Sequence, residues 1–191
     1  MATTIDEVII SRRTVKPTSM NGQKIDNETI GELLQLADWA PTHGYTEPWY
    51  YVIFSGEKVQ QFCNDHAELY RAQTPADKFL SGNYEKLKHQ GDLASHVIAI
   101  CVKRGNNPKI PVLEEIAAVA CATENILLGA TARGLASYWG SGGMTYHPAM
   151  HEYLGLGEED QVLGFLYLGY TSEPVQAGRR LKPQAEKFKW M

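Results

Sequence analysis

The feature that most constrains the fold is a long helical pattern over residues 111–133. Pro111 suits the first position of a helix, and Gly134 suits the residue just after one. From Ile116 to Cys121 the pattern is apolar nearly all round, and a helix that is apolar on every side has to be buried on every side. A chain of 191 residues offers little room for that. The pattern therefore favours a second subunit as the other cover, with a central core helix in a monomer as the alternative.

Shorter helical patterns lie on either side of this helix. Thr4 and Glu7 have the spacing of a capping box at the start of a first helix. Asp26 stands where a second helix would be capped, and Pro41 ends that pattern. Residues 56–90 predict two more helices divided by Pro75. This segment fits either a mobile lid or a plain surface excursion.

Four apolar runs predict strands, and the first is expected to be buried. The second is apolar without interruption, as in a strand covered on both faces. Together with the helices they predict an α+β fold, in which residues 1–191 form one layered domain with a mixed sheet of about four or five strands. The runs are residues 50–54, 96–102, 135–139 and 162–168.

The tail from Gly178 onward is basic, yet it carries Phe188 and Trp190. A free tail rarely holds aromatic side chains without packing them. We therefore expect an arm that reaches a neighbouring surface, swapped onto the other subunit if the protein is a dimer.

Bulk properties exclude several classes of protein. A net charge of -4 argues against non-specific nucleic-acid binding, which needs a broad basic surface. No apolar run approaches the length of a membrane span, and the N-terminus lacks the pattern of a secretory signal. The three cysteines are widely spaced and odd in number, which favours free thiols over disulfides and predicts a reducing cytoplasm.

The basic stretch from Ser11 to Lys16 is the first candidate binding site. Guanidinium groups match phosphate oxygens in pairs, and an ammonium group adds a point charge. In an extended segment Arg12, Thr14 and Lys16 would leave on one face, so that one phosphate-bearing ligand could meet all three. The alternative is a solvated basic turn.

Other motifs are weaker taken singly. The turn Gly140-Ser141-Gly142-Gly143 follows a strand end, where open sheets often bind ligands. His147 and His151 are four residues apart, but the full zinc motif is missing, so we expect surface or capping roles and no metal. His43 lies in a polar loop and could donate a hydrogen bond to a ligand.

Several motifs occur together in the order typical of one family and span nearly the whole chain. As a set they resemble the FMN-dependent nitroreductase family, and most closely its small, short-chain branch. That resemblance implies a homodimer with two FMN molecules at the subunit interface, each site built from both chains. The motifs are Arg12-Arg13-Thr14-Val15-Lys16 after a short helix, Ala40-Pro41-Thr42-His43 with a downstream Pro48-Trp49, Trp139-Gly140-Ser141-Gly142 at a strand end, the strand between Gly164 and Gly169, and Lys182-Pro183.

The cofactor contacts that the resemblance implies fall into two groups. One holds the phosphate and the ribityl–pyrimidine side of FMN, and the other lies along its ring system with backbone N–H groups near the reactive edge. The first group is Arg12, Arg13, Thr14, Lys16, Arg180 and Lys182. The second group is Trp39, His43, Trp139, Gly140 and Ser141, of which Trp39 and His43 would come from the partner subunit.

One departure from the family pattern concerns Glu47. The family loop commonly carries an amide before its Pro-Trp pair, whereas this chain has Tyr45-Thr46-Glu47. A carboxylate there would repel an anionic flavin, so we expect Glu47 to face away from the cofactor.

The resemblance also implies the reaction. NAD(P)H would reduce the flavin, leave, and be replaced by an electron-poor acceptor such as a nitroaromatic, a quinone or an enone, with no protein nucleophile. A more specialised flavin reductase or dehalogenase is one alternative. A flavin-binding or redox-sensing protein without turnover is another.

Overall fold

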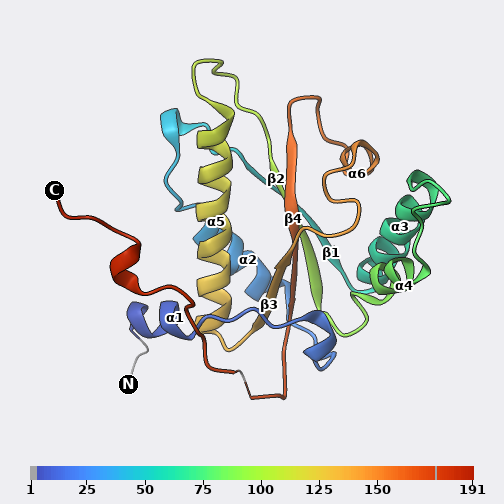
Figure 1. The fold of residues 1–191 in the computed structure, drawn as a ribbon, viewed down its shortest axis with the longest axis horizontal. Helices are drawn as coiled ribbons and strands as arrows, with labels where there is room; N and C mark the ends of the chain where they lie inside the picture. Colours follow the sequence, from blue (N-terminus) through green and yellow to red (C-terminus); the bar gives the residue numbers. More distant parts are fainter. Residues whose placement is uncertain (1–3, 175) are drawn as a thin grey trace.

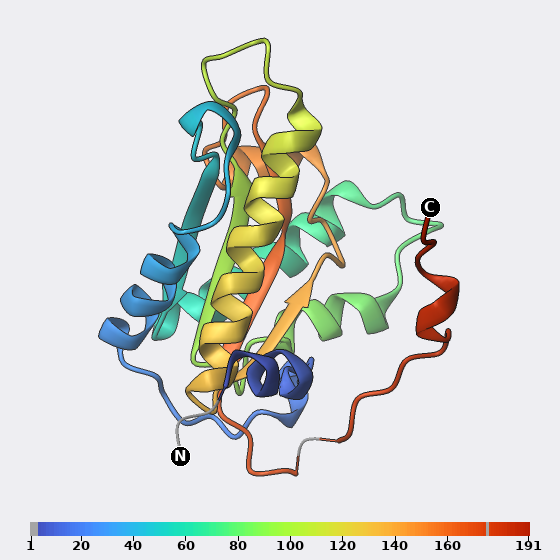
Figure 2. The same cartoon turned by 90° about the vertical axis from the view of Figure 1, so that its left-hand side faces the viewer.

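The computed structural model describes residues 4–174 and 176–191, and one four-stranded sheet with helices on both faces forms its centre (Figures 1 and 2). The strands are β1 (Trp49–Ser55), β2 (His96–Val102), β3 (Ala136–Gly140) and β4 (Gln161–Gly169), in the order β1-β2-β4-β3. The helices are α1 (Ile5–Ser11), α2 (Asn27–Ala37), α3 (Glu57–Gln73), α4 (Ser81–His89), α5 (Val112–Ala132) and α6 (Pro148–Tyr153), with short 3₁₀ turns at Pro17–Ser19, His43–Tyr45 and Gln184–Glu186. The predicted α+β class is confirmed.

The sheet is antiparallel in each of its three pairings, whereas the sequence predicted a mixed sheet. The pairing of Ser55 with His96 shows why. After β1 the chain makes its helical excursion through α3 and α4 and then re-enters the sheet beside the point where it left. A parallel pairing would require the connection to cross to the opposite end of the sheet.

The central strand β2 is buried on both faces, as predicted. Its alternating side chains divide between two cores. Ile98 and Ile100 pack with α2 and α5 on one face. Val97 and Ala99 pack with α3 and α6 on the other. Figure 1 shows these two helical layers on either side of the sheet.

Strand β1 is not the buried strand that its apolar run predicted. It lies at the edge of the sheet with one neighbour, and Tyr50 and Ile53 are 40% and 43% exposed. An edge strand and a central strand can carry the same short apolar run. The run alone therefore does not predict how deeply the strand is buried, because burial depends on the order of the strands in the sheet.

Capping residues and a proline in the sequence correctly predicted where three helices begin or end. The Thr4 backbone N–H donates to Glu7 Oε2 at 2.7 Å, which completes the predicted capping box of α1. Asp26 caps α2 by accepting from the Thr29 backbone N–H at 2.7 Å. Pro75 separates α3 from α4, as predicted. Burial of Cys63 and Cys101 as free thiols also agrees with the sequence.

Helix α5 runs along the sheet and is covered on one side only in the single chain (Figure 2). Val119, Ala122 and Ile126 are buried in the core that α5 shares with α2 and β2. On the opposite side Leu113 is 74% exposed and Cys121 is exposed. The apolar ring predicted from the sequence is therefore present, with its outer half open to solvent.

The C-terminal segment leaves the body of the molecule as an extended arm (Figure 2). Phe188 and Trp190 contact each other edge to face, with ring centroids 5.9 Å apart, and both are exposed. The single chain offers these aromatic side chains no core to pack in.

A buried ion pair ties the start of α5 to the loop after β2. Glu115 is 1% exposed and contacts the Arg104 guanidinium. Its Oε1 also accepts from the Gly105 backbone N–H at 3.0 Å. The neighbouring Glu114 instead forms an exposed contact with His43.

We predict that Glu115→Ala lowers the free energy of unfolding by about 3–5 kcal/mol, because it leaves the Arg104 charge buried without its partner. The matched variant Glu114→Ala should cost less than about 1 kcal/mol, since its pair is solvated. Urea unfolding followed by circular dichroism measures both. Equal losses in the two variants would contradict this account of the loop.

Candidate functional site

The basic segment after α1 runs alongside β3. The Val15 backbone N–H donates to the Ser137 carbonyl oxygen at 2.9 Å, and the backbone is extended at Arg12 and Lys16. Two stretches more than 120 residues apart in the sequence are thereby brought side by side. The predicted phosphate-binding segment therefore lies beside the strand whose far end carries the predicted turn.

Side chains of the basic segment leave it in different directions. Arg12 points to the α5 side, where its Nε lies 3.2 Å from Glu124 Oε1. Val15 packs into the opposite core, which contains Met20 and Phe54. Thr14 and Lys16 line a cleft together with Arg13, and Arg12 is not part of that lining.

Arg13 is engaged within the chain. Its Nη1 donates to the Ile10 carbonyl oxygen at 2.6 Å, and its Nε donates to the Gln176 carbonyl oxygen at 3.1 Å. The tail passes so close to the guanidinium that a Cβ at Gly178 would lie 2.5 Å from Arg13 Cζ. Arg13 thus fastens the outgoing C-terminal segment beside the basic segment.

Two adjoining clefts border Arg13. One, of about 450 Å³, is lined by Arg13, Thr14 and Lys16 on one side and by Thr171 and Glu173 on the other. The second, of about 290 Å³, is lined by α1, Arg13 and the tail residues 178–180, which include Arg180. The structure therefore brings Arg13, Thr14, Lys16 and Arg180 into one region. Lys182 lies on the exposed arm and lines neither cleft.

The turn after β3 is exposed in its first half. Trp139 is partly buried and packs against Gly164, where a Cβ would lie 2.5 Å from the indole Nε1. Ser141 and Gly142 are exposed. The tip of the turn is therefore open to solvent, and its binding of a ligand stays a prediction.

The end of the turn, Met144 and Thr145, is buried, and His66 of α3 holds it. The Met144 backbone N–H donates to His66 Nε2 at 2.8 Å, and Thr145 Oγ1 donates to the Gly142 carbonyl oxygen at 2.7 Å. Gly143 has φ 65° and touches the imidazole, so that a Cβ there would lie 2.5 Å from Nε2. A side chain at this position would be both strained and blocked.

Sequence reasoning missed His66. The signal that could have found it is the buried face of α3, which repeats at helical spacing as Val59, Phe62, Cys63, His66 and Ala67. His66 is the polar member of that apolar stripe. A polar side chain at such a position has to find a hydrogen-bond partner inside the protein.

The loop that carries His43 and Glu47 lies away from the basic segment in the single chain. His43 contacts Glu114 in the first turn of α5. Arg12 contacts Glu124, ten residues further on, which is roughly 15 Å along the helix. Within one chain His43 therefore does not reach the basic segment. The Glu47 side chain, which we expected to face away from a cofactor, belongs to the same distant loop.

Trp39 is 86% exposed at the end of α2. It lines an apolar groove of about 420 Å³ together with Ile5 and Val8 of α1 and Leu128 of α5. An indole this exposed, set in an apolar groove, is typical of a surface that another protein covers.

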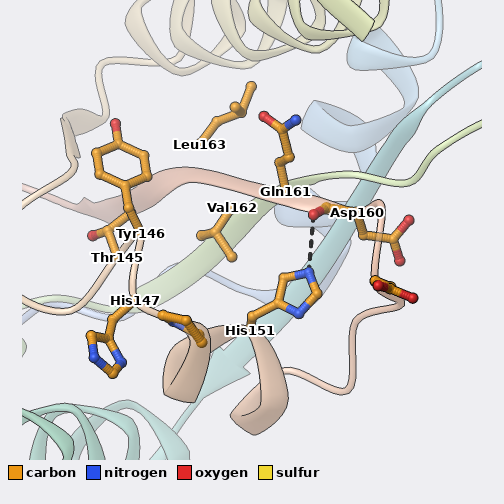
Figure 3. Close-up of a pocket in the computed structure, with 10 residues that line it drawn as sticks. Thr145, Tyr146, His147, His151, Asp160, Gln161, Val162 and Leu163 are labelled. Atoms are coloured by element: carbon orange, nitrogen blue, oxygen red, sulfur yellow. Dashed lines mark hydrogen bonds between the residues drawn. The ribbon is translucent and has the colours of Figure 1, made fainter. Parts of the chain in front are cut away.

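A further cavity of about 420 Å³ lies between the turn, α6 and the start of β4 (Figure 3). His147 caps α6 by accepting from the Ala149 backbone N–H at 3.1 Å, which confirms the predicted capping role. His151 Nε2 lies 2.9 Å from the Asp160 carbonyl oxygen. In residues 4–174 and 176–191 no group of three or more His, Cys, Asp or Glu side chains is placed to hold a metal ion.

The family model named Nitroreductase family matches residues 9–170, and the chain belongs to the Nitroreductase family. The Escherichia coli (strain K12) protein YdjA, provisionally named an NAD(P)H nitroreductase, is 28% identical over 166 residues. That match spans 85% of this chain and 86% of YdjA.

Solved structures show the same fold. A nitroreductase-like family protein from Bacillus cereus superimposes with a TM-score of 0.86 at 27% identity, over 100% of this chain and 97% of that one. A Bacteroides fragilis nitroreductase with bound FMN has a TM-score of 0.73 at 23% identity, over 98% of each chain. Within the described residues of this protein, no helix has the length and apolar character needed to span a membrane.

We predict that His66 makes stability depend on pH. Burial lowers the pKa of His66 from 6.5 to about 4, so the unfolded chain binds more protons between these values. The stabilisation is complete above pH 6.5 and is lost as the pH falls toward 4, by roughly 3 kcal/mol in all.

Urea unfolding of the wild type and of His66→Gln between pH 7.5 and 4 measures this term. Burial also lowers the pKa of His96, which the two proteins share, so the difference between them isolates His66. The variant's stability should fall less steeply over this range. Parallel curves would show that His66 does not titrate as its burial requires.

Proposed function

We propose that this protein is an FMN-dependent NAD(P)H oxidoreductase that works as a homodimer. The observation that carries the proposal is the position of the basic segment beside β3, the strand that ends in the exposed turn, in a chain of the Nitroreductase family. One region offers cations for a phosphate and exposed backbone amides for a ring. Relatives named as NAD(P)H nitroreductases, and the Bacteroides fragilis structure with FMN, support this choice of ligand.

The residues present fit the cofactor. The phosphate of FMN carries nearly two negative charges, and Lys16 and Thr14 of the larger cleft would offer it charge-assisted hydrogen bonds. The Arg12 guanidinium would join them by leaving its partly exposed partner Glu124. Arg180 is fastened nearby through the contact of the tail with Arg13. The exposed amides at Ser141 and Gly142 would meet the edge of the ring system, with Trp139 beside it.

A second copy of the chain would complete the site. The outer face of α5 and the groove at Trp39 are apolar and exposed in the single chain, and the C-terminal arm carries aromatic residues away from its own body. Closing the groove against a partner would bury these surfaces. It would also bring the His43 loop of one subunit to the basic segment of the other, a contact that the single chain does not make.

When bound, FMN would supply two-electron transfer between NAD(P)H and an electron-poor acceptor such as a nitroaromatic, a quinone or an enone. The protein's residues would bind and orient it. Fixed positive charge from Arg12 and Lys16 would stabilise the negative charge that accumulates on reduction and so raise the reduction potential. No side chain of the site has to act as a nucleophile.

The purified protein should take up FMN, and the bound flavin should lose its absorption between about 350 and 500 nm when NAD(P)H is added under argon. Adding nitroaromatic, quinone, enone and halogenated acceptors to the reduced protein identifies the acceptor class. Flavin that is reduced no faster than free FMN would favour a binding or sensing protein without turnover. A protein that does not bind FMN would refute the proposal.

Arg12→Ala should weaken FMN binding by about two orders of magnitude with the fold intact, since it removes a charged contact to the phosphate. Glu124→Ala is the matched control, because it breaks the same ion pair but keeps the guanidinium. Its FMN affinity should equal or exceed that of the wild type. Equal weakening in both variants, measured by titration of the visible spectrum, would show that the ion pair matters and not the phosphate contact.

A further inference from the structure

The turn after β3 combines an accessible tip with a fixed base. Ser141 and Gly142 are exposed, whereas Met144 and Thr145 are buried. The base lies against α3, an element of the excursion between β1 and β2 that contributes none of the sequence-predicted cofactor contacts. The orientation of the tip therefore depends on a contact with α3, which holds none of the residues that the sequence predicted to bind the cofactor.

That contact is one hydrogen bond in an apolar setting. A backbone N–H can only donate, so the bond from Met144 requires His66 Nε2 to be unprotonated, and the neutral ring carries its proton on Nδ1. The imidazole packs against the rings of Phe62 and Phe165, with centroids 5.6 and 5.4 Å away. The close approach of Gly143 fixes the distance between turn and ring.

Packing alone does not explain a histidine at this position. The ring is 2% exposed among apolar neighbours, where a leucine or phenylalanine would avoid the cost of burying a polar group. The same burial keeps the ring neutral at physiological pH, because it lowers the pKa of His66 to about 4. The acceptor is therefore available to the Met144 N–H at physiological pH.

We propose that His66 is a positioning residue for the flavin: by holding the Met144 amide it fixes the Gly140–Thr145 turn and thereby aims the exposed amides of Ser141 and Gly142 at the edge of the ring. This inference rests on the proposed FMN function. It assigns no contact between His66 and the cofactor, since the histidine acts through the turn. Its effect should fall on hydride transfer and on the flavin spectrum, and only weakly on the affinity that the phosphate anchors supply.

Three variants separate positioning from simple stability. His66→Leu fills the space but removes the acceptor, and His66→Gln keeps an acceptor oxygen at a similar reach. Phe62→Leu is the matched control, because it lies one turn earlier on α3, packs in the same ring cluster and makes no hydrogen bond to the turn. The cavity that Phe62→Leu creates should destabilise the fold but leave the hydrogen bond from the Met144 N–H to His66 in place.

The first readout is hydrogen exchange of residues 141–146 in each purified protein. His66→Leu should speed exchange of the Met144 amide by about tenfold or more, and Phe62→Leu should not single out this segment. The second is flavin reduction by NAD(P)H in the FMN-loaded proteins. His66→Leu should slow it by about tenfold, with a shifted flavin spectrum and an FMN Kd changed less than about threefold, and His66→Gln should recover part of the rate.

The outcomes distinguish the two proposals. A wild-type protein that does not take up FMN refutes the proposed function and the flavin role of His66 together. A wild-type holoprotein whose His66→Leu and Phe62→Leu variants change exchange and reduction alike refutes the role of His66 alone. Faster exchange in His66→Leu with an unchanged reduction rate and spectrum also refutes it, because the turn would then be held without serving the flavin.

Discussion

The structure depends on the contact between the basic segment and β3, made by the backbone bond from Val15 to Ser137. The bond places the segment beside the sheet and fixes which side chains face which way. Val15 enters one core, and Arg12 is directed to α5 on the other face. Because β3 ends in the exposed turn, the same contact sets the distance between the cationic anchors and the backbone amides of the tip.

The cationic side chains of this region differ in whether they hold the fold together or line a cleft that could bind a ligand. Arg13 is committed to the carbonyl oxygens of Ile10 and Gln176 and holds the tail in place. Lys16 has no such commitment and lines the larger cleft. A single anionic partner at Arg12, Glu124, is itself partly exposed, so an incoming phosphate could compete for the guanidinium at little cost. The proposed cofactor would thus meet anchors that the fold has already oriented.

Local rules predicted much of the fold. The caps at Thr4 and Asp26, the break at Pro75 and the two-sided burial of β2 each follow from a few neighbouring residues. Sheet order and strand direction do not, because they are decided by pairings such as Ser55 with His96 across a long excursion. The burial assigned to β1 was wrong for the same reason.

The candidate site, like the fold, could be predicted from the sequence only in part. Thr14 and Lys16 were predicted from charge and spacing, and the structure places them in a cleft beside Arg13, which also borders the cleft of Arg180. Their contact with a phosphate stays a prediction. The structural role of Arg13 could not be predicted from the sequence, because its partners are backbone carbonyl oxygens and one of them, at Gln176, is 163 residues away. His66 was missed because its function lies in one long-range hydrogen bond.

Subunit complementation tests the central claim most directly, which is that each cofactor site is built from two chains. At an FMN concentration that saturates only the wild type, Arg12→Ala should abolish activity from one side of the site. His43→Asp should do so from the other, because we expect His43 beside the ring and a carboxylate there would repel the reduced flavin. Co-expressed with separate tags, the two chains should form heterodimers with one intact site, restoring about a quarter of wild-type activity in a random mixture. Full activity of His43→Asp alone, or heterodimers as inactive as their parents, would contradict the account.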